Sequence, residues 1–596
     1  MKIITKPPGL CNDNREPNKY LRAPFYCDIL LFGLLLYLVR IMYTLFALTG
    51  LIITLIISSL SVYLRRKHPA KENRFFSAVG SFIDRYYPIF LLLILAVFLI
   101  SRVLKLESFP DGFHVDEMSM AADAKSILYN GTDRWGIHYP AYFQNYGGGQ
   151  NALYIYIQAF LLSFLPSTIF SFRIQAVFWG AVCLLVMFAI SYELIGSRGY
   201  ALMGPILVTV LPVYIMSERW GLEAYIFLPI SAIVMFLVIR AIRHDRFYDW
   251  VLAGLFMGVS LYTYAVSYVV WPVFLILTLL YLLYIKKITL KQSILFLIPL
   301  AVLAFPLILF QLVNFRIISP LTLGVSDYIP LPEARGEDLG LTNAWASLKF
   351  TGKLLLGGEH LIYNSFKEFG TIYLFLIPFM IAGFVICIKK TVLSIKTKTY
   401  TSHALILFFW FGSVVFQLLV KGPSVNRMNM IFMPFLLFIV VGIYSLHSES
   451  PLAITWLAVW TCASFVLFMH FYFFVAKTVY ARHELFTNSS FGKAIVRSEK
   501  YYMKDEDTHI YVQYENEAID PNLQTFYFAG VPGDVYSEEE TTYGRVTAQL
   551  PEEIDVNENA VYIIGDQWPH ITSYLISQGF LADQSLPGCS ILFRLN

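Results

Sequence analysis

Long apolar stretches recur along most of this chain, and they limit what it can fold into more than any other feature. Each stretch covers about 18–24 residues, which is enough for a helix to cross a hydrocarbon core of about 30 Å. The whole chain is 57% hydrophobic and 14% charged, with a mean hydropathy of +0.60. A soluble domain carries about 25% charged residues. The sequence therefore predicts a polytopic α-helical membrane protein.

The apolar stretches predict about eleven core spans after an N-terminal extension. An apolar region at 25–63 precedes the core, and its length fits either a hairpin of two spans or an interfacial helix and one span. Short loops rich in Lys and Arg fall on one side when the spans alternate, so this side is predicted to be cytoplasmic. The predicted spans are 86–104, 172–193, 200–216, 224–241, 250–267, 268–285, 292–313, 370–388, 403–420, 428–446 and 453–475, and the basic loops are 65–74, 240–246, 286–291 and 389–398.

Charge changes sign after about residue 476. From Lys477 onward eight Lys and Arg oppose eighteen Asp and Glu, so this tail is near −10 and the remainder near +13. We expect an N-terminal extension (1–83), a transmembrane domain (84–475) and a small extracytoplasmic α/β domain (476–596). In the tail, "HIYVQYE", "LQTFYFAG", "AVYIIGD" and "CSILFRL" predict strands, and "ITSYLISQGF" predicts a helix. Its preferred interpretation is a lid or an acceptor-docking domain.

Two adjacent acids, Asp116 and Glu117, follow the first core span in "GFHVDEMSM". Over "DEMSMAADAKSILYNG", Asp116, Met120 and Asp123 share one face of a helix that we expect to lie along the membrane surface. Acids in a first helical turn also complement the helix dipole, so a purely structural role fits equally well. The stretch "GGGQNALYIYIQAFLLSFLP" predicts a second interfacial segment.

Cations gather on the same side of the membrane as these acids. Charged groups at membrane edges often only snorkel, so each alone fits an anchor better than a ligand. Together they predict a site that holds a lipid phosphate and uses a carboxylate as base. The group comprises Arg173 at the start of the second core span, Arg219 with Glu223 in "SERWGLEAY", Lys353 and His360 in the 314–369 loop, and Lys421 and Arg427 in "KGPSVNRMNMIFMP".

The order of these features resembles the GT-C membrane glycosyltransferases. That order is a span, "DE", two surface helices, an Arg-led span, a short loop with an arginine and an acid, a long late loop, "NRxxxxxxP" and a soluble tail. The resemblance is closest to the protein O-mannosyltransferase branch, which includes the lipid A aminoarabinose transferase. "DEMSMAADAKSILYNGTDRWGIHYP" and "LYIYIQAFLLSF…FRIQAVFWGA" are similar to uncharacterised bacterial members. The resemblance covers roughly residues 84–475.

The resemblance implies an inverting glycosyltransferase that takes a sugar from a polyprenyl-phosphate donor outside the cytoplasm. It requires no cofactor, implies no metal site, and predicts membrane lipid but no nucleic acid as a partner. The chain lacks the lumenal β-trefoil insertion of eukaryotic protein mannosyltransferases, which puts a protein acceptor in doubt. The implied roles are Asp116 as base, Glu117 as positioning acid, Glu223 as a second site acid, and Arg173, Arg219, Arg427, Lys353 and His360 as contacts to the donor phosphate.

The chemistry of such a transfer agrees with one base and one positioning acid. Direct displacement at an anomeric carbon needs a single carboxylate to take the acceptor proton, unlike a retaining glycosidase. Arginine contacts stabilise the growing charge on the leaving phosphate, which makes a divalent metal dispensable. Consecutive helical residues point about 100° apart. Asp116 and Glu117 therefore cannot both face one proton.

Three other readings remain open at this level. A polyprenyl-linked oligosaccharide polymerase or ligase would need no acidic pair after the first core span. A transporter or flippase would carry ionisable residues in mid-span and internal repeats. A non-enzymatic scaffold has no sequence signature. A glycan on the "NGT" triplet at Asn130 would crowd the proposed site, which with scarce external cysteine favours a bacterial plasma membrane.

Overall fold

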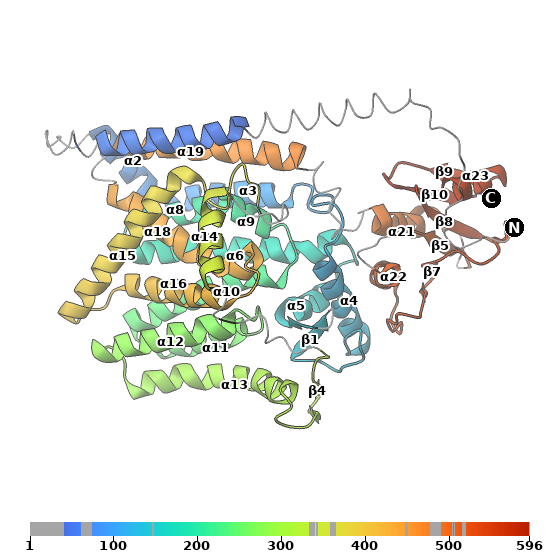
Figure 1. Ribbon diagram of the computed structural model, residues 1–596, viewed down its shortest axis with the longest axis horizontal. Helices are drawn as coiled ribbons and strands as arrows, with labels where there is room; N and C mark the ends of the chain where they lie inside the picture. Colours follow the sequence, from blue (N-terminus) through green and yellow to red (C-terminus); the bar gives the residue numbers. More distant parts are fainter. Residues whose placement is uncertain are drawn as a thin grey trace.

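The computed structural model describes residues 41–60, 63, 74–145, 148–332, 340, 344–357, 365–446, 451–476, 490–503, 505, 507–514 and 520–594. In this part of the chain nine helices are long and apolar enough to cross a membrane, or ten if the bent pair Ala78–Arg85 and Tyr87–Val103 forms one span. They pack side by side as a bundle (Figure 1). The protein is thus a polytopic helical membrane protein with a small sheet domain at its C-terminal end.

The bundle is built from long helices with short ones between them. The long helices are Ile41–Leu60, α3 (Tyr87–Val103), α6 (Ile169–Ile195), α10 (Glu223–His244), α12 (Ser267–Tyr284), α13 (Leu290–Asn314), α15 (Ile377–Thr397), α16 (Ser402–Leu419), α18 (Phe432–Leu446) and α19 (Pro451–His470). The short ones are α2 (Arg74–Arg85), α7 (Arg198–Ala201), α8 (Met203–Val210), α9 (Pro212–Ser217), α11 (Phe247–Ser260), η2 (Leu374–Leu376), η3 (Asn429–Ile431) and η4 (Phe471–Val475).

Two predicted spans differ from the structure. Residues 200–216 form α7, α8 and α9 in place of one span, because Leu211 before Pro212 adopts an extended backbone that interrupts a helix. The predicted span 250–267 is the shorter helix α11, which ends at Ser260. In the 25–63 region the structure shows one helix over 41–60, and residues 25–40 lie outside the described part.

The segments outside the bundle gather at one of its ends. They are α4 (Val115–Asn130), α5 (Leu153–Leu162), α14 (Ala344–Gly357), α17 (Val425–Met428), and the hairpins β1 (Tyr142–Asn145) with β2 (Gly148–Asn151) and β3 (Leu321–Leu323) with β4 (Ser326–Tyr328). Figure 1 shows α4, α5, β1 and β4 at this end beside the tail. The basic loop 286–291 between α12 and α13 lies at the opposite end.

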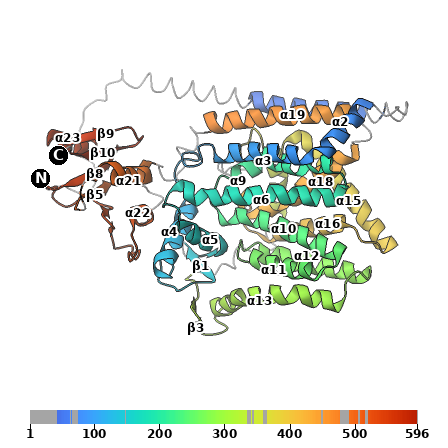
Figure 2. The ribbon, with the colours of Figure 1, turned by 180° about the vertical axis from the view of Figure 1, so that it is seen from behind.

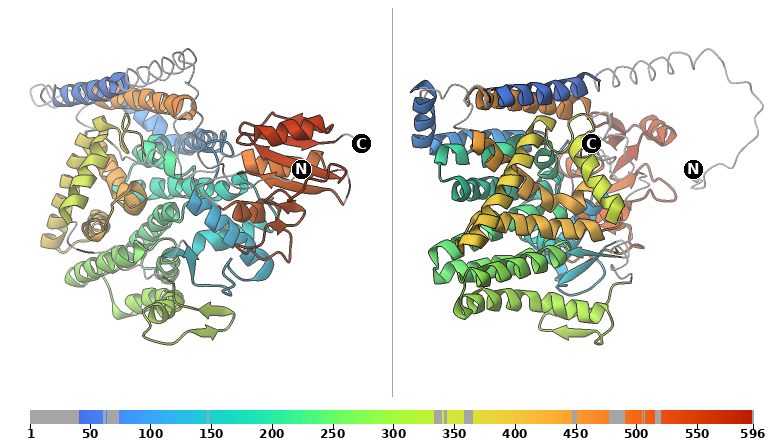
Figure 3. Two further views of the ribbon diagram at one scale, coloured as in Figure 1. Left: turned by 45° about the vertical axis from the view of Figure 1, so that its right-hand side comes forward. Right: turned by 60° about the vertical axis from the view of Figure 1, so that its left-hand side comes forward.

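Helix α4 is buried, which corrects the prediction of a helix lying on the membrane surface. Met120 and Asp123 are both 0% exposed. Helix α5 packs on one side of α4, and the tail covers another (Figures 2 and 3). The amphipathic pattern alone predicts membrane contact, because the sequence does not show which later segment covers the helix.

The tail is a six-stranded mixed sheet with three helices. Its strand order is β6-β7-β5-β8-β10-β9, with β5 parallel to β7 and β8, and β10 antiparallel to β8 and β9. The elements are α21 (Ser490–Tyr501), β5 (His509–Gln513), α22 (Pro521–Ala529), β6 (Thr542–Tyr543), β7 (Val546–Thr547), β8 (Ala560–Gly565), α23 (Pro569–Ser577), β9 (Leu581–Asp583) and β10 (Cys589–Phe593).

Three of the four predicted tail strands and the predicted helix are confirmed as β5, β8, β10 and α23. The strand predicted for "LQTFYFAG" is wrong, because this stretch forms α22. Asp520 caps that helix by accepting a hydrogen bond from the Asn522 N–H at 2.9 Å, and Pro521 stands at its first position. Both features start helices, and they outweigh the strand preference of the aromatic residues that follow.

The tail is fastened directly to α4 and to the start of α6. The Nζ of Lys125 on α4 donates to the carbonyl oxygen of Tyr527 at 2.6 Å, and the hydroxyl of Tyr527 donates to the carbonyl of Thr168 at 3.1 Å. The Asn130 side chain donates to the Asp534 carbonyl at 2.9 Å. The helix that carries the acidic pair therefore lies between the bundle and the tail.

Candidate active site

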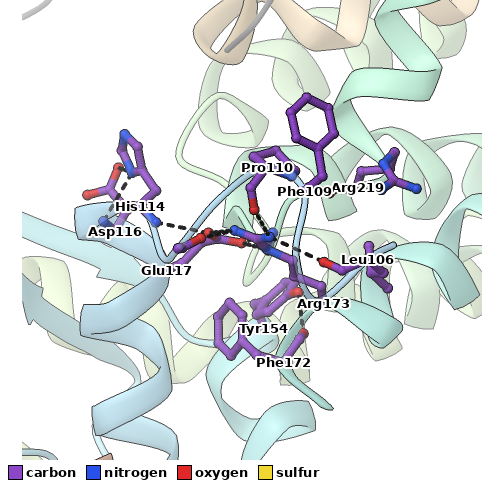
Figure 4. A network of polar contacts seen from close by, with 12 residues as sticks. Leu106, Phe109, Pro110, His114, Asp116, Glu117, Tyr154, Phe172, Arg173 and Arg219 are labelled. Atoms are coloured by element: carbon purple, nitrogen blue, oxygen red, sulfur yellow. Dashed lines mark hydrogen bonds and ion pairs between the residues drawn. The ribbon is translucent and has the colours of Figure 1, made fainter. Parts of the chain in front are cut away.

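The acidic pair occupies the first turn of α4. The Nδ1 of His114 accepts a hydrogen bond from the Asp116 N–H at 3.1 Å, and the Glu117 carboxylate accepts one from the His114 N–H at 3.0 Å. This reciprocal capping box satisfies N–H groups that the helix itself leaves unpaired. It also fixes the directions of the two acids, which diverge (Figure 4).

Glu117 points into the protein and is fully buried. Its two oxygens bind Arg173 in a bidentate pair, with Nε–Oε1 and Nη2–Oε2 distances of 2.8 and 2.7 Å, and the Gly221 N–H donates to it at 2.8 Å. Burial alone would raise the pKa of this carboxyl, but the Arg173 charge and the backbone N–H donors hold the pKa below its ordinary value. Glu117 is therefore held in one orientation by donors on several sides.

Arg173 binds the loop that links α3 to α4 as well as Glu117. Its Nη1 donates to the Pro110 carbonyl at 2.8 Å, and its Nη2 donates to the Gly112 carbonyl at 2.5 Å. A buried loop without regular structure leaves carbonyl groups that need donors, and the guanidinium fork supplies several from one side chain. Arg173 therefore holds the backbone immediately before the acidic pair (Figure 4).

Arg219 binds the last turn of α3 and the loop that follows it. Its guanidinium donates to the carbonyls of Ser101 at 3.0 Å, Arg102 at 2.5 Å and Phe109 at 2.8 Å. The side chain is 0% exposed and lies over the ring of Phe473, 4.9 Å from its centroid. Arg219 therefore ties the end of α3 to the π-helical turn η4.

These contacts change what the two buried arginines can do. The resemblance implied that Arg173 and Arg219 contact a donor phosphate. In this structure both side chains are 0% exposed, and their donors bind Glu117 and loop carbonyls. A phosphate would reach either guanidinium only if the loop rearranged. Both side chains hold the segment that presents the acids, and their contact to a donor phosphate stays a prediction.

Asp116, in contrast, points away from this network. Its side chain is 43% exposed, and its Oδ2 lies 3.6 Å from the His114 Nδ1. The imidazole in turn packs edge-to-face with Trp220, with ring centroids 5.7 Å apart. A carboxylate that is solvent-accessible yet mounted on a rigid helix start is in a position to accept a proton from an external hydroxyl.

Glu223 lies at the first residue of α10, 8% exposed. Its carboxylate accepts a hydrogen bond from the Asn151 N–H, and the Asn151 side chain donates to the Tyr268 hydroxyl at 3.0 Å. Three residues earlier, Trp220 contacts His114. The segment 220–223 therefore contacts His114 beside Asp116 and is linked to the start of α12 through Asn151.

Tyr268 forms part of the wall of a cavity of about 530 Å³ between α12, α13, the end of α16 and α17. The lining is mostly apolar and includes Leu261, Val266, Leu307, Ile308 and Phe416, and Arg427 supplies its charged group. The Nη1 of Arg427 donates to the Lys421 carbonyl at 2.6 Å, which orients the guanidinium. A long apolar wall with an arginine suits an isoprenoid chain that ends in a phosphate.

The structure does not place the remaining predicted site residues at the acidic pair or in the cavity. Lys353 is exposed on α14 and does not line the cavity. His360 lies outside the described residues. In the described part of the chain no group of three or more His, Cys, Asp or Glu side chains could hold a metal ion. Transfer without a metal stays a prediction.

Sequence reasoning missed two features that support the site. A Cβ on Gly221 would lie 2.1 Å from the Phe172 ring, so only glycine lets this N–H reach Glu117. The second feature is a buried ion pair between Arg102 and Glu218, with a distance of 2.8 Å between Nη2 and Oε2. In the sequence, the glycine between Trp220 and Leu222 was the one signal for the first feature. The ion pair left no local signal, because the partners of a buried charge lie far apart in sequence.

A second buried acidic pair lies farther along α4 and in the loop after it. Asp123 is 0% exposed, and Asp133 is 1% exposed and accepts hydrogen bonds from the Trp135 and Ile137 N–H groups at 2.9 Å. Burial raises the pKa of Asp123 against the opposing charge of Arg134. Burial and the neighbouring charge of Asp123 raise the pKa of Asp133 to about 7.

This raised pKa predicts a specific dependence of stability on pH. Between its ordinary pKa of 3.8 and the folded value of about 7, Asp133 binds more proton in the folded than in the unfolded protein. Stability therefore falls as pH rises through that window. We expect Asp133→Asn, which keeps the Oδ1 acceptor, to flatten the decline of Tm between pH 5 and 7.5. Asp566→Asn, at an exposed position, is the control, and an unchanged slope in Asp133→Asn would contradict the assignment.

Comparison with solved structures finds matches at low sequence identity. The first match is ArnT, the lipid A aminoarabinose transferase, from Cupriavidus metallidurans bound to undecaprenyl phosphate, with 11% identity, a TM-score of 0.47, and coverage of 84% of this chain and 97% of that chain. An oligosaccharyltransferase from Archaeoglobus fulgidus in complex with zinc and sulfate matches at 10% identity and a TM-score of 0.44, over 82% and 69% of the two chains.

These two solved structures are proteins to which this chain is similar at low identity. No protein-family model and no curated protein sequence matches it.

Proposed function

We propose that this protein is an inverting glycosyltransferase that moves a sugar from a polyprenyl-phosphate donor to a hydroxyl of an extracytoplasmic acceptor. The observation that carries the proposal is that the two neighbouring acids in the first turn of α4 have opposite environments. One acid, Glu117, is buried in a bidentate pair with Arg173, while the next-door acid, Asp116, is 43% exposed on the rigid turn so formed. An enzyme with one base and one positioning acid needs this arrangement.

In the proposed reaction the acceptor hydroxyl attacks the anomeric carbon as its proton passes to Asp116. The bond between the anomeric carbon and the phosphate oxygen breaks, and polyprenyl phosphate leaves with the electron pair. The attack comes from the face opposite the leaving group, so the anomeric centre inverts. Asp116 supports this step because its carboxylate faces outward and is not held in an ion pair with an arginine or lysine in the described residues.

The apolar cavity is the proposed donor site. Its volume of about 530 Å³ and its Leu, Ile, Val and Phe lining suit several isoprene units, and Arg427 would bind the phosphate. Its wall connects to the Asp116 loop through the start of α10. Glu223 reaches Tyr268 through Asn151, and the Tyr225 hydroxyl donates to Asn426, the neighbour of Arg427.

The acceptor would meet the donor at the end of the bundle where the tail lies. This end is proposed to face out of the cytoplasm, because the basic loop 286–291 lies at the opposite end (Figure 1). The acceptor is a hydroxyl of a cell-envelope glycan, lipid or protein, and the membrane is proposed to be a bacterial plasma membrane. Lys353 and His360 stay predicted phosphate contacts of the late loop.

The proposal is tested by sugar transfer with the purified protein in lipid vesicles. The assay offers a panel of labelled undecaprenyl-phosphate sugars, a cell-envelope extract as acceptor, and EDTA throughout. Transfer from one donor to the extract, with inversion at the anomeric carbon, is expected. A folded protein that transfers none of the sugars, or that transfers with retention, would contradict the proposal.

Arg427→Gln is expected to weaken use of the donor. Loss of a charge-assisted contact to a phosphate costs roughly 1.5–3 kcal/mol, so we expect the KM for the donor to rise about tenfold or more. The control is Arg316→Gln, an exposed arginine after α13 that does not line the cavity. Equal donor KM values in the two variants would remove Arg427 from the donor site.

A further inference from the structure

A second cavity, of about 290 Å³, lies where the tail meets the ends of the spans. Helix α21 supplies one wall through Lys493, Arg497 and Lys500. The opposite wall contains Glu107 and Thr168 of the membrane domain, and Phe528 of α22 closes one side. The proposed transfer reaction uses none of these side chains.

The three cations form one face of α21. Their spacing of four and three residues aligns them along the helix. They are three of the eight Lys and Arg in a tail that carries eighteen Asp and Glu, so positive charge is concentrated where the tail faces the bundle. Arg497 is held by Asp583 at 3.3 Å and donates to Ser585, which fixes the middle of the face.

The cavity lies at the depth of lipid headgroups. Thr168 is the N-cap of the span α6, and Glu107 follows the end of the span α3. Span ends mark the border between hydrocarbon and the polar interface, where lipid phosphates lie. Cations at this level attract anionic headgroups.

Two aromatic side chains in contact lie between this cavity and the candidate active site. The Phe528 ring lies 6.0 Å from the ring of Phe113, which directly precedes His114 and the acidic pair. The adjacent Tyr527 accepts the hydrogen bond from Lys125 on α4. An occupant of the cavity would therefore press on the same tail helix that covers α4.

We propose that this cavity binds the phosphate of an anionic phospholipid headgroup and so holds the tail against α4. Lys493 and Lys500 contact the phosphate, Arg497 fixes the wall between them through its pair with Asp583, and the apolar side chains of Val496, Phe528 and Leu586 face the glycerol region. Glu107 opposes the bound anion and limits its affinity. The site does not depend on the proposed transfer reaction, and its occupancy is measured without any sugar donor.

The test uses the full chain in detergent with phosphatidylglycerol, phosphatidylcholine or inorganic phosphate added separately. Native mass spectrometry counts retained lipid, and thermal unfolding measures stabilisation. Phosphatidylglycerol is expected to bind and to raise Tm, and Lys493→Gln/Lys500→Gln is expected to weaken its binding about tenfold, as the loss of two interfacial cations implies. Glu107→Gln is expected to tighten it.

Lys349→Gln/Lys367→Gln provides the matched control, because it removes two exposed lysines outside the cavity. This variant should bind phosphatidylglycerol as the wild type does. Equal binding of phosphatidylglycerol and phosphatidylcholine, or equal loss in both double variants, would overturn the proposal. If inorganic phosphate alone raised Tm as much as phosphatidylglycerol does, the proposal that the bound phosphate belongs to a lipid would be contradicted.

Discussion

Asp116→Asn is expected to lower the rate of sugar transfer by about 10²–10⁴-fold, the usual contribution of a general base. The asparagine amide has nearly the same size as the carboxylate but cannot take the acceptor proton. Because the Asp116 side chain is 43% exposed and its capping contact to His114 uses the backbone N–H, the fold should survive the change. The loss should therefore fall on kcat and leave the donor KM nearly unchanged.

The measurement compares transfer by Asp116→Asn, wild type and Asp111→Asn at matched thermal stability. Asp111 lies five residues earlier in the same loop and takes no part in the ion-pair network of the described residues. Equal rates of transfer by Asp116→Asn and wild type would contradict the assignment of Asp116 as the general base. Glu223, which is 8% exposed, would then be the next candidate, because Glu117 is 0% exposed and is enclosed by Arg173 and backbone donors.

Glu117→Gln is expected to lower the free energy of unfolding by about 3–5 kcal/mol, because it leaves the Arg173 charge buried without its partner. The carboxylate now accepts from Arg173, His114 and Gly221, and an amide replaces only part of this set. Arg173→Gln should cost a similar amount, since it also leaves the carbonyls of the 104–114 loop without donors. Thermal or denaturant unfolding in detergent measures both.

A partly exposed pair supplies the comparison for this buried one. Arg243 and Glu193 form an ion pair in which the arginine side chain is 40% exposed. Pairs of this kind contribute about 0–1 kcal/mol, so Glu193→Gln should change stability little. The double variant Glu117→Gln/Arg173→Gln should cost less than the sum of its single changes, as residues in contact do. Additive losses would show that the pair is not coupled.

The two predictions separate the roles of two neighbouring residues. One substitution should remove catalysis and spare the fold, and the other should weaken the fold and disturb catalysis only through it. The helix start makes this possible, because consecutive side chains diverge by about 100°. His114, which caps α4 through both its ring and its N–H, keeps the turn rigid while one acid faces inward and the other outward.

Several elements could be predicted from the sequence because their signals are local. The spans follow from hydropathy over some 20 residues, and β5, β8, β10 and α23 follow from short periodic patterns. The local signal failed at α22, where aromatic residues suggested a strand but the cap at Asp520 and Pro521 started a helix. It failed again at 200–216, where Pro212 interrupts an otherwise apolar run.

The sequence by itself determined that this chain crosses a membrane many times and carries an acidic pair beside cations at one membrane face. Only the tertiary structure decided which charges meet. Arg173, Arg219 and Arg427 look alike in sequence, yet the first two are buried against Glu117 and loop carbonyls, while the third lines an apolar cavity. Hydropathy depends on neighbours along the chain, whereas the role of a charge depends on partners that only folding brings within 3 Å of it.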